Sequence, residues 1–246
     1  IDDMRHAAVN GRGEYLSAGN AASLADALDQ AFAEFQQGSG TASAVSFNSQ
    51  EILEDTLVFR TFYNTKTNTG DLVAQPITDA GEVGDPVWNS AARLDLVTYD
   101  DREIFTFDRD SDSDTYTDGI PFRPTTLNDD QKAVFIDDPS SSDAQKNLEV
   151  TQRVNYLRGQ TDNERPDGNF RERPATEGKL GDVVHSQPTF IGPPSRLGRD
   201  AEPFPQDDLY SAFKGANENR DTVVYVAAND GMMHGFDATN GDEMFA

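Results

Sequence analysis

The feature that most constrains the fold is an alternation of apolar and polar residues that begins near Thr41. It runs through the stretches ASAVSFN, LVFRTFYN, GDLVAQPI and EIFTFD, which are separated by turn residues. Because neighbouring side chains of a β-strand point to opposite faces, this period indicates strands with one buried face. The pattern returns towards the C-terminal end in GDVVHSQPTFIG, TVVYVAA and GMMHGFDA. The sequence therefore predicts a mainly β protein built from antiparallel sheets.

Two of these regions resemble each other. TGDLVAQPITDAGEV begins at Thr69, and NDGMMHGFDATNGDEMF begins at Asn229. Each contains a glycine in a turn, a strand, a second glycine-containing turn and the start of a further strand. A repeat of one hairpin per unit is typical of a β-propeller or a related array. We therefore expect propeller blades, and we expect the last blade to be open and the ring of blades incomplete.

The first part of the chain has a helical period instead. The short strand-like stretch GEYLSA precedes Asn20, a good helix N-cap, and apolar residues then recur on one helical face: Leu24, Leu28, Ala31, Phe32 and Phe35. A strand followed by an amphipathic helix is the closing unit of an α/β domain. We therefore expect residues 1–38 to be the C-terminal end of such a domain and residues 39–246 to be the incomplete propeller.

Two helical insertions are expected within the β region. The first covers Asp129–Phe135, where Asn128 as N-cap and Gln131 three residues later form a capping-box pattern. The second runs from about 144 to 158, is capped by Asp143, and should bury three apolar side chains, Leu148, Val154 and Leu157.

The charge balance limits the possible partners. The chain has 44 acidic and 20 basic residues and a formal net charge of -24. Such a surface repels phosphate groups and anionic lipids, which argues against nucleic acid and membrane surfaces as partners. Cysteine is absent, which excludes disulfides, cysteine zinc sites and thiol catalysis. No apolar run approaches the length of a membrane span.

Several motifs together resemble a known family. GDVVHSQP from Gly181 is followed, after a Pro-rich loop and a YSAF step at Tyr210, by VYVAANDGMMHGFDA from Val224. VNYLRG from Val154 and GNFRER from Gly168 fit the same pattern. In this order the motifs resemble the opening blades of the PilC/PilY family, the type IV pilus tip-associated adhesins and assembly factors of Gram-negative bacteria.

The resemblance extends to the N-terminal part and implies a function. HAAVNGRGEYLSAGNAASLADAL is similar to the last strand and helix of the von Willebrand factor A-like domain that precedes the propeller in this family. The D-x-S-x-S metal motif of such domains would lie before Ile1. The resemblance implies a non-enzymatic protein at the pilus tip, on the cell surface or outside the cell. It would contact minor pilins and host or abiotic surfaces in pilus biogenesis, adhesion and twitching motility.

The strongest chemical motif is DRDSDSDTYTD, from Asp108 to Asp118. Its carboxylates fall at alternating positions, and such a run repels itself unless a cation or solvent screens it. We expect a calcium (Ca²⁺) site whose ligands are Asp110, Asp112, Asp114, Asp118 and the carbonyl of Tyr116. The loop is not an EF-hand, which needs Gly where Thr115 stands and Glu where Pro121 stands. The alternative is a solvated acidic hairpin tip.

The histidines offer weaker candidates. His185 and Ser186 are neighbours on an expected strand, so their side chains point to opposite faces and do not form a nucleophile and base pair. His234 is expected to pack in the core. DGMMHGFDATNGDEMF also resembles the repeat of quinoprotein propellers that use pyrroloquinoline quinone, with Phe245 where that repeat ends in Trp. A quinoprotein dehydrogenase and a general extracellular calcium-binding propeller are therefore the alternative functions.

Overall fold

The computed structural model describes residues 44–47, 56–78, 81–109, 116–194, 198, 200–201, 207 and 209–246. These residues belong to one compact unit, Ala42–Ala246. The expected end of an α/β domain, residues 1–38, lies outside the described residues.

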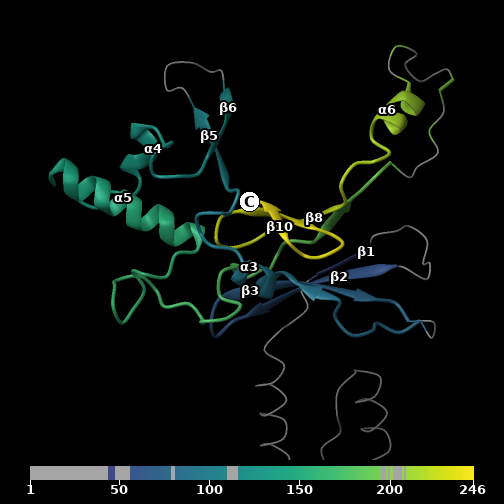
Figure 1. Cartoon of the computed structure of the whole chain (residues 1–246), viewed down its shortest axis with the longest axis horizontal. Coiled ribbons are helices and arrows are strands. Elements are labelled where there is room, and N and C mark those ends of the chain that lie inside the picture. Colours follow the sequence, from purple (N-terminus) through teal and green to yellow (C-terminus); the bar gives the residue numbers. More distant parts are fainter. Residues whose placement is uncertain are drawn as a thin grey trace, which may run out of the picture. The chain divides into compact units, whose positions relative to one another are not determined.

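The first four strands form a four-stranded antiparallel sheet, sheet 1, in sequence order (Figure 1). Its members are β1 (Ala44–Phe47), β2 (Leu57–Asn64), β3 (Thr69–Pro76) and β4 (Trp88–Asn89). A second antiparallel sheet, sheet 2, has the same order and consists of β7 (Thr189–Ile191), β8 (Val223–Ala227), β9 (Met233–Asp237) and β10 (Glu243–Phe245). Both sheets are simple meanders, as the alternating sequence pattern predicts.

The sequence repeat has a structural counterpart. Its two copies supply β3 and β9, which are the third strands of their sheets, and each is followed by the fourth strand. Within the described ranges the strands form these two sheets and one two-stranded sheet, and no ring of sheets closes. The described part of the chain is mainly β with antiparallel sheets, as expected.

One apolar core joins the two sheets. From sheet 1 and α3 (Ser90–Asp95) it takes Phe59, Leu72, Ala74, Trp88 and Leu94, and from the second half of the chain it takes Leu180, Val183, Val224, Val226, Phe236 and Ala238. Full burial of one such large side chain contributes about 1.5–3 kcal/mol. The backbone also crosses between the halves, because the Gly70 N–H donates to the Leu180 carbonyl at 3.0 Å. The core therefore holds the two sheets together directly.

Trp88 is the largest side chain at this junction. Its Nε1–H donates to the Ala238 carbonyl at 3.2 Å, and its ring lies 5.9 Å from that of Phe59. Gly241, in the turn between β9 and β10, has φ 78° and lies against the indole, where an added Cβ would come within 2.5 Å of the ring. Glycine is therefore required at this position on two grounds, its backbone conformation and the approach of the ring.

The chain between the two sheets forms an insertion (Figure 1). It contains a hairpin of β5 (Phe105–Arg109) and β6 (Tyr116–Pro121), followed by α4 (Asp129–Ala133) and α5 (Asp143–Arg158). A separate small core supports it, made of Leu127, Val150 and Val154 with Phe122, Phe135 and Ile136 around them. A further helix, α6 (Tyr210–Ala216), lies between β7 and β8 in sequence and buries none of its residues.

Several sequence expectations need correction. The capping box of α4 forms as predicted, but α5 is capped by Ser142 with Gln145, one residue earlier than expected. Leu148 is 56% exposed, because α5 turns Val150 and Val154 towards the small core instead. GDVVHSQP is not a regular strand, since in this region only Thr189–Ile191 forms one. Neither α3 nor α6 was predicted from the apolar pattern, because both helices are short.

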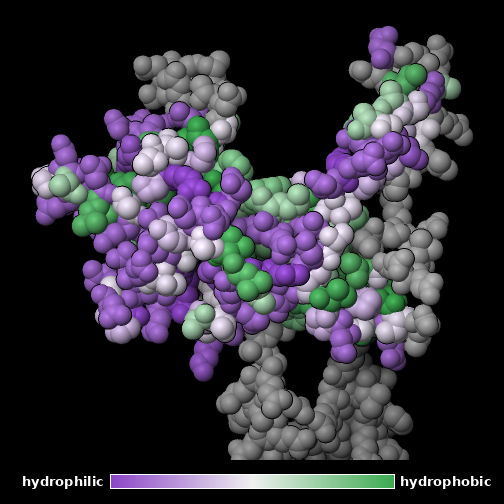
Figure 2. Space-filling view, viewed as in Figure 1, coloured by the Kyte–Doolittle hydropathy of each residue, from purple (hydrophilic) through white to green (hydrophobic). Residues whose placement is uncertain are grey.

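The face shown in Figure 2 is mostly hydrophilic, with small, separate hydrophobic patches. This agrees with a chain that carries a net charge of -24. In the described part of the chain, no helix has both the length and the apolar character that crossing a bilayer requires.

Candidate functional site

The acidic loop connects the two strands of the β5–β6 hairpin. Arg109 at the end of β5 lies opposite Tyr116 at the start of β6, so residues 110–115 join paired strand ends. Asp110, Asp112 and Asp114 lie outside the described residues, and Tyr116 and Asp118 belong to β6. Among the side chains that the structure describes, no group of three or more His, Asp or Glu could hold a metal ion. The calcium site therefore stays a prediction.

The base of this hairpin is fixed to α4. The Asn128 side chain donates to the carboxylate of Asp108 at 2.6 Å, and it also caps α4 by accepting from the Gln131 N–H. Gln131 in turn donates from Nε2 to the Phe107 carbonyl at 2.9 Å. The capping box thus serves two purposes, because the residues that start α4 also hold the strand that leads into the acidic loop.

A second cluster of charged side chains is buried inside sheet 2. His234 on β9 is fully buried, with Nδ1 2.8 Å from Glu243 Oε1 and Nε2 3.1 Å from Asp230 Oδ2. Glu243 accepts two hydrogen bonds of 2.7 Å from Arg102, from Nε and Nη2. The side chains of this bidentate pair are 1% and 2% exposed. The cluster of Asp230, His234, Glu243 and Arg102 is called the ion chain below.

The ion chain continues into the insertion. Arg102 Nη1 donates to the carbonyl of Arg158, the last residue of α5. The Arg158 guanidinium is also buried and donates to four carbonyls, those of Tyr99, Asp100, Arg102 and Phe122. These hydrogen bonds provide donors for backbone carbonyl groups where the chain enters and leaves the insertion. Two arginines therefore attach the insertion to sheet 2.

The ionisation states of the ion chain follow from its contacts. Burial alone disfavours every charge, but the paired hydrogen bonds outweigh it. Burial notwithstanding, bonds from Arg102 and His234 lower the pKa of Glu243 to about 2, and the bond from His234 lowers the pKa of Asp230. The pKa of His234 is raised, because its two carboxylate partners outweigh the cost of burial. These contacts thus favour the ionised forms of Asp230 and Glu243 and the protonated form of His234.

Sheet 1 has a buried acid with the opposite behaviour. Asp71 accepts from the Ala91 N–H at 3.0 Å and from the Ser90 hydroxyl at 3.2 Å at the start of α3. Burial raises its pKa to about 6 in spite of these bonds, since no cation is among the groups that shift it. Sequence patterns gave no sign of either buried acid, because their partners are distant in sequence, with Ala91 20 positions from Asp71 and Arg102 141 positions from Glu243.

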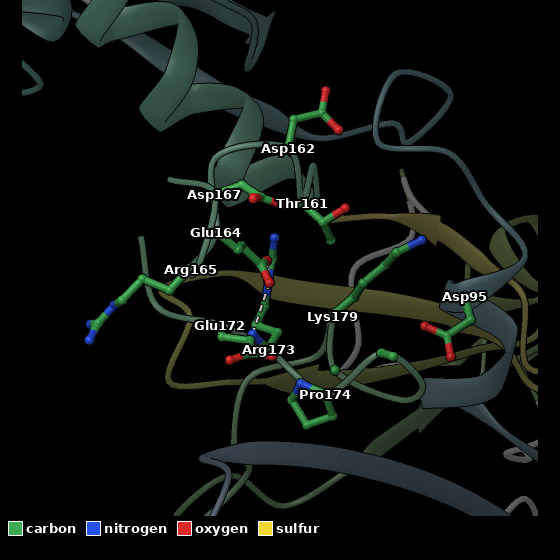
Figure 3. Close-up of a pocket in the computed structure, with 12 residues that line it drawn as sticks. Asp95, Thr161, Asp162, Glu164, Arg165, Asp167, Glu172, Arg173, Pro174 and Lys179 are labelled. Atoms are coloured by element: carbon green, nitrogen blue, oxygen red, sulfur yellow. Dashed lines mark hydrogen bonds and ion pairs between the residues drawn. The ribbon is translucent and has the colours of Figure 1, made fainter. Parts of the chain in front are cut away.

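A cavity of about 460 Å³ lies beside the loop that follows α5 (Figure 3). Two of its lining cations, Arg173 and Lys179, are engaged within the chain. Arg173 Nε lies 2.6 Å from Glu164 Oε1 and its guanidinium stacks 4.3 Å over the ring of Tyr156, while Lys179 donates to the carbonyls of Leu94 and Val97. Figure 3 shows Arg165 directed away from the other labelled side chains. These bonds fasten the loop to α5 and to the end of α3.

The two described histidines lie in different environments, since His185 is exposed and His234 is buried. His185 is exposed, and the Ser186 hydroxyl accepts from the Ala227 N–H, so the two side chains do not form a catalytic pair. His234 lies in the core, as predicted. The sequence pattern did not reveal its two carboxylate partners. Asp230 lies four residues earlier, in the turn before β9, and Glu243 lies on the neighbouring strand β10.

Four-stranded antiparallel meanders that pack through a shared apolar core are the kind of unit from which β-propellers are built. Residues 180–246 match the family profile described as "PilY1 beta-propeller domain". This match covers the approach to β7 and all of sheet 2.

Curated relatives extend the similarity to the whole chain. "Type IV pilus biogenesis factor PilY1" of Pseudomonas aeruginosa is 31% identical in strain UCBPP-PA14 and 33% identical in strain PAK, in each case over 100% of this chain and 21% of the relative. "Type IV pilus biogenesis factor PilY1 homolog" of Xylella fastidiosa is 32% identical over 92% of this chain and 16% of the relative. The chain belongs to the PilC/PilY family. It spans about a fifth of the length of the Pseudomonas relatives that it matches. No solved structure shows significant similarity to it.

Proposed function

We propose that this chain is part of a type IV pilus biogenesis factor that acts by binding other proteins at the cell surface. The observation that carries the proposal is the identity of 31–33% over the whole chain to proteins named for that role. The family match to the propeller domain supports it independently, because a propeller is a rigid scaffold for binding surfaces. The role needs no enzymatic activity.

In this proposal the two sheets are neighbouring propeller blades. The docking of Trp88 of sheet 1 on the Ala238–Gly241 turn of sheet 2 supports it. Quinoprotein-type repeats end in Trp, and Trp88 follows the first copy of the repeat in this chain as the first residue of β4. An A-like domain before the propeller, as residues 1–38 suggest, completes the proposed arrangement.

The finer parts of the role follow from the family. We place the protein at the pilus tip of a Gram-negative bacterium, in contact with minor pilins, and give it roles in adhesion to host or abiotic surfaces and in twitching motility. The test is deletion of the full-length gene in its source organism, followed by complementation with the full gene or with a gene lacking codons 42–246. We expect surface pili and twitching zones to return only with the full gene. Normal pili in the deletion strain would refute the proposal.

The competing enzymatic function has a direct test. Full-length protein would be incubated with pyrroloquinoline quinone and a redox dye, using primary alcohols and aldoses as substrates. We expect no dye reduction above that of heat-denatured protein. Substrate-dependent reduction would favour the quinoprotein dehydrogenase alternative.

We also propose that residues 110–118 bind Ca²⁺ through Asp110, Asp112, Asp114, Asp118 and the Tyr116 carbonyl. Support comes from the fixed ends of the loop, since Arg109 pairs with Tyr116 and Asp108 is held by Asn128. Ligands at alternate positions can converge when a short loop winds around one ion, and carboxylates suit calcium. The ion would then stabilise the insertion, which makes the proposed binding function calcium-dependent.

Thermal unfolding with Ca²⁺, Mg²⁺ or chelator tests this site. At a hundredfold excess over Kd, Ca²⁺ should add about 2.7 kcal/mol, and Mg²⁺ much less. Asp112→Ala and Asp114→Ala should abolish the effect. Asp85→Ala, which removes the same charge at an exposed position in sheet 1's last connection, should keep it. If Ca²⁺ does not raise the Tm of the parent, or if it raises the Tm of the loop variants as much as that of Asp85→Ala, the loop is a solvated acidic tip.

A further inference from the structure

The ion chain contains a histidine whose protonation state is fixed by its neighbours. Both ring nitrogens of His234 face carboxylate oxygens, Glu243 Oε1 at 2.8 Å and Asp230 Oδ2 at 3.1 Å. An ionised carboxylate only accepts hydrogen bonds, and a neutral imidazole has only one N–H. Both contacts are hydrogen bonds only if His234 is an imidazolium.

The two carboxylates are themselves held in the ionised form. Glu243 accepts hydrogen bonds from both Nε and Nη2 of Arg102. Asp230 accepts from two backbone amides, Gly181 N–H at 3.0 Å and Met232 N–H at 3.0 Å. Hydrogen bonds of this kind favour the charged form of a carboxylate. A neutral acid that would donate to the ring is therefore not the form that these contacts stabilise.

The charges of the ion chain cancel only when His234 is protonated. The groups that face the ring are Asp230 from the turn between β8 and β9 and Glu243 from β10, with Arg102 behind Glu243 and the uncharged Phe236 ring stacked at 5.8 Å. Lys179 adds a more distant positive charge near Glu243. Loss of the ring proton would leave a net negative charge in a site that is almost closed to water, which is costly.

The weaker side of the cluster is the contact with Asp230. A neutral ring that keeps its Nδ1 proton still donates to Glu243, which Arg102 also supports. Its Nε2 lone pair then faces the Asp230 carboxylate, which repels it. The Asp230 side chain is 19% exposed, whereas that of Glu243 is 2% exposed, so Asp230 has access to water as a replacement partner. Deprotonation should therefore open the Asp230 contact first.

Asp230 links this event to the junction of the sheets. It holds the Gly181 N–H, and Gly181 forms an antiparallel bridge with Thr69 of β3. An added Cβ at Gly181 would come within 2.6 Å of the Asp230 backbone nitrogen, so the two segments pack closely. A shift of Asp230 is thus transmitted to the segment around Gly181, which precedes β7 and bridges to Thr69 of sheet 1.

We propose that His234 is a pH-sensitive latch, whose imidazolium form ties β9 to β10 and to Gly181 and whose neutral form releases the Asp230–Gly181 side. The latch goes beyond the proposed pilus role and does not depend on it. Because the pKa of His234 is raised on folding, its stabilisation is complete below the unfolded value of about 6.5 and is lost as pH rises through the folded value. The latch is therefore closed below about pH 6.5 and opens at higher pH, as the His234 ring loses its proton.

The proposal is tested on the full 246-residue chain by NMR of the histidine rings between about pH 6 and about pH 9. We expect both ring nitrogens of His234 to carry protons at about pH 6.5 and the ring to lose a proton only above this unperturbed value. Protection of the Gly181 amide against hydrogen exchange, corrected for the intrinsic rate, should fall in the same pH range. The Gly70 amide, which donates to Leu180 across the junction, should change less. A neutral His234 at pH below about 6.5 would overturn the latch.

Variants give a second readout. Over the same range the parent Tm should fall by roughly 3–5 °C for each pK unit by which folding raises the His234 pKa. His185→Gln should follow the parent, and His234→Gln should lose this pH dependence. If His234→Gln does not fold, Asp230→Asn replaces it, since it keeps the size of the side chain and should lower the His234 pKa. An unchanged His234 titration in Asp230→Asn would also overturn the proposal.

Discussion

Sheets 1 and 2 share a strand order but differ in what they bury. Both are four-stranded meanders whose third strands carry the sequence repeat. In sheet 1 the fourth strand begins with Trp88, which reaches across to the Ala238–Gly241 turn of sheet 2. In sheet 2 the fourth strand carries Phe245, which stays on its own sheet over Gly235 and 5.8 Å from the Tyr225 ring. Two sheets with the same strand order therefore place the aromatic residue of the fourth strand differently, one against the other sheet and one against its own.

The difference also separates two kinds of stabilisation. The core around Trp88 between the sheets is apolar and gains its stability from area removed from water, which hardly depends on pH. Sheet 2 also carries the ion chain, which attaches the insertion through Arg102 and Arg158. Ionic attachments respond to pH and to the loss of one partner more strongly than apolar contacts do.

The largest effect should come from the ion chain. Arg102→Ala leaves Glu243 buried without its guanidinium, and breaking one partner of a buried pair costs about 3–5 kcal/mol. Urea unfolding at neutral pH measures it. Arg93→Ala is the matched control, because Arg93 forms an exposed pair with Asp242 at 3.6 Å, which is worth at most about 1 kcal/mol. Equal losses of unfolding free energy in the two variants would mean that the buried pair stabilises the fold no more than the exposed pair does.

The apolar junction should be the next most sensitive. Trp88→Phe shortens the ring and leaves the Ala238 carbonyl without its donor, for an expected loss of about 1–3 kcal/mol that is independent of pH. The exposed Phe213 on α6 provides a control, since Phe213→Ala should change the free energy of unfolding by no more than about 0.5 kcal/mol. If the loss of unfolding free energy in Trp88→Phe depended on pH, the contacts of Trp88 would not be purely apolar, which would contradict this prediction.

Asp71 should give sheet 1 a pH dependence of its own. Its pKa is about 6 when folded, against 3.8 ordinarily, so the folded state binds more protons between these values and gains stability as pH falls through them. Asp71→Asn keeps the accepting oxygen without the buried charge. We expect the variant to be more stable than the parent at neutral pH by on the order of 1–2 kcal/mol, with no advantage below about pH 4. Urea unfolding of both proteins across this range measures the difference. A variant that is less stable than the parent at neutral pH would contradict this.

The smallest effect should be local to the insertion. Asn128→Ala removes the N-cap of α4 and the donor to Asp108, at a cost of about 1 kcal/mol. Hydrogen exchange should show faster opening of α4 and β5, while the amides of β8 and β9 keep their protection. A global loss of protection would mean that the insertion and sheet 2 unfold as one unit.

Much of this architecture follows from sequence, because local rules decide it. Alternation located β2 to the residue and β3 to within one residue at each end, and the Asn128–Gln131 spacing located the α4 capping box. The repeat identified the equivalent strands of the two sheets. These features depend on side-chain period and on hydrogen bonds that span three residues, both of which a single sequence displays.

The rest depends on contacts between distant residues. Arg102 and Glu243 are separated by 141 positions, and Trp88 and Ala238 by 150, so neither partner reveals the other in the sequence. Leu148 is apolar yet exposed, since only the packing of α5 decides which face is covered. The acidic loop was the clearest chemical motif in the sequence, and its three central aspartates lie outside the described residues.

The two sheets pack directly on each other around Trp88, which is the chain's one tryptophan. Its fluorescence therefore reports on that junction without labelling. We predict emission at shorter wavelength than free tryptophan, slow quenching by acrylamide, and a single red shift when urea separates the sheets. Emission like that of free tryptophan, or fast quenching, in a protein whose circular dichroism is that of a folded β protein would contradict the account.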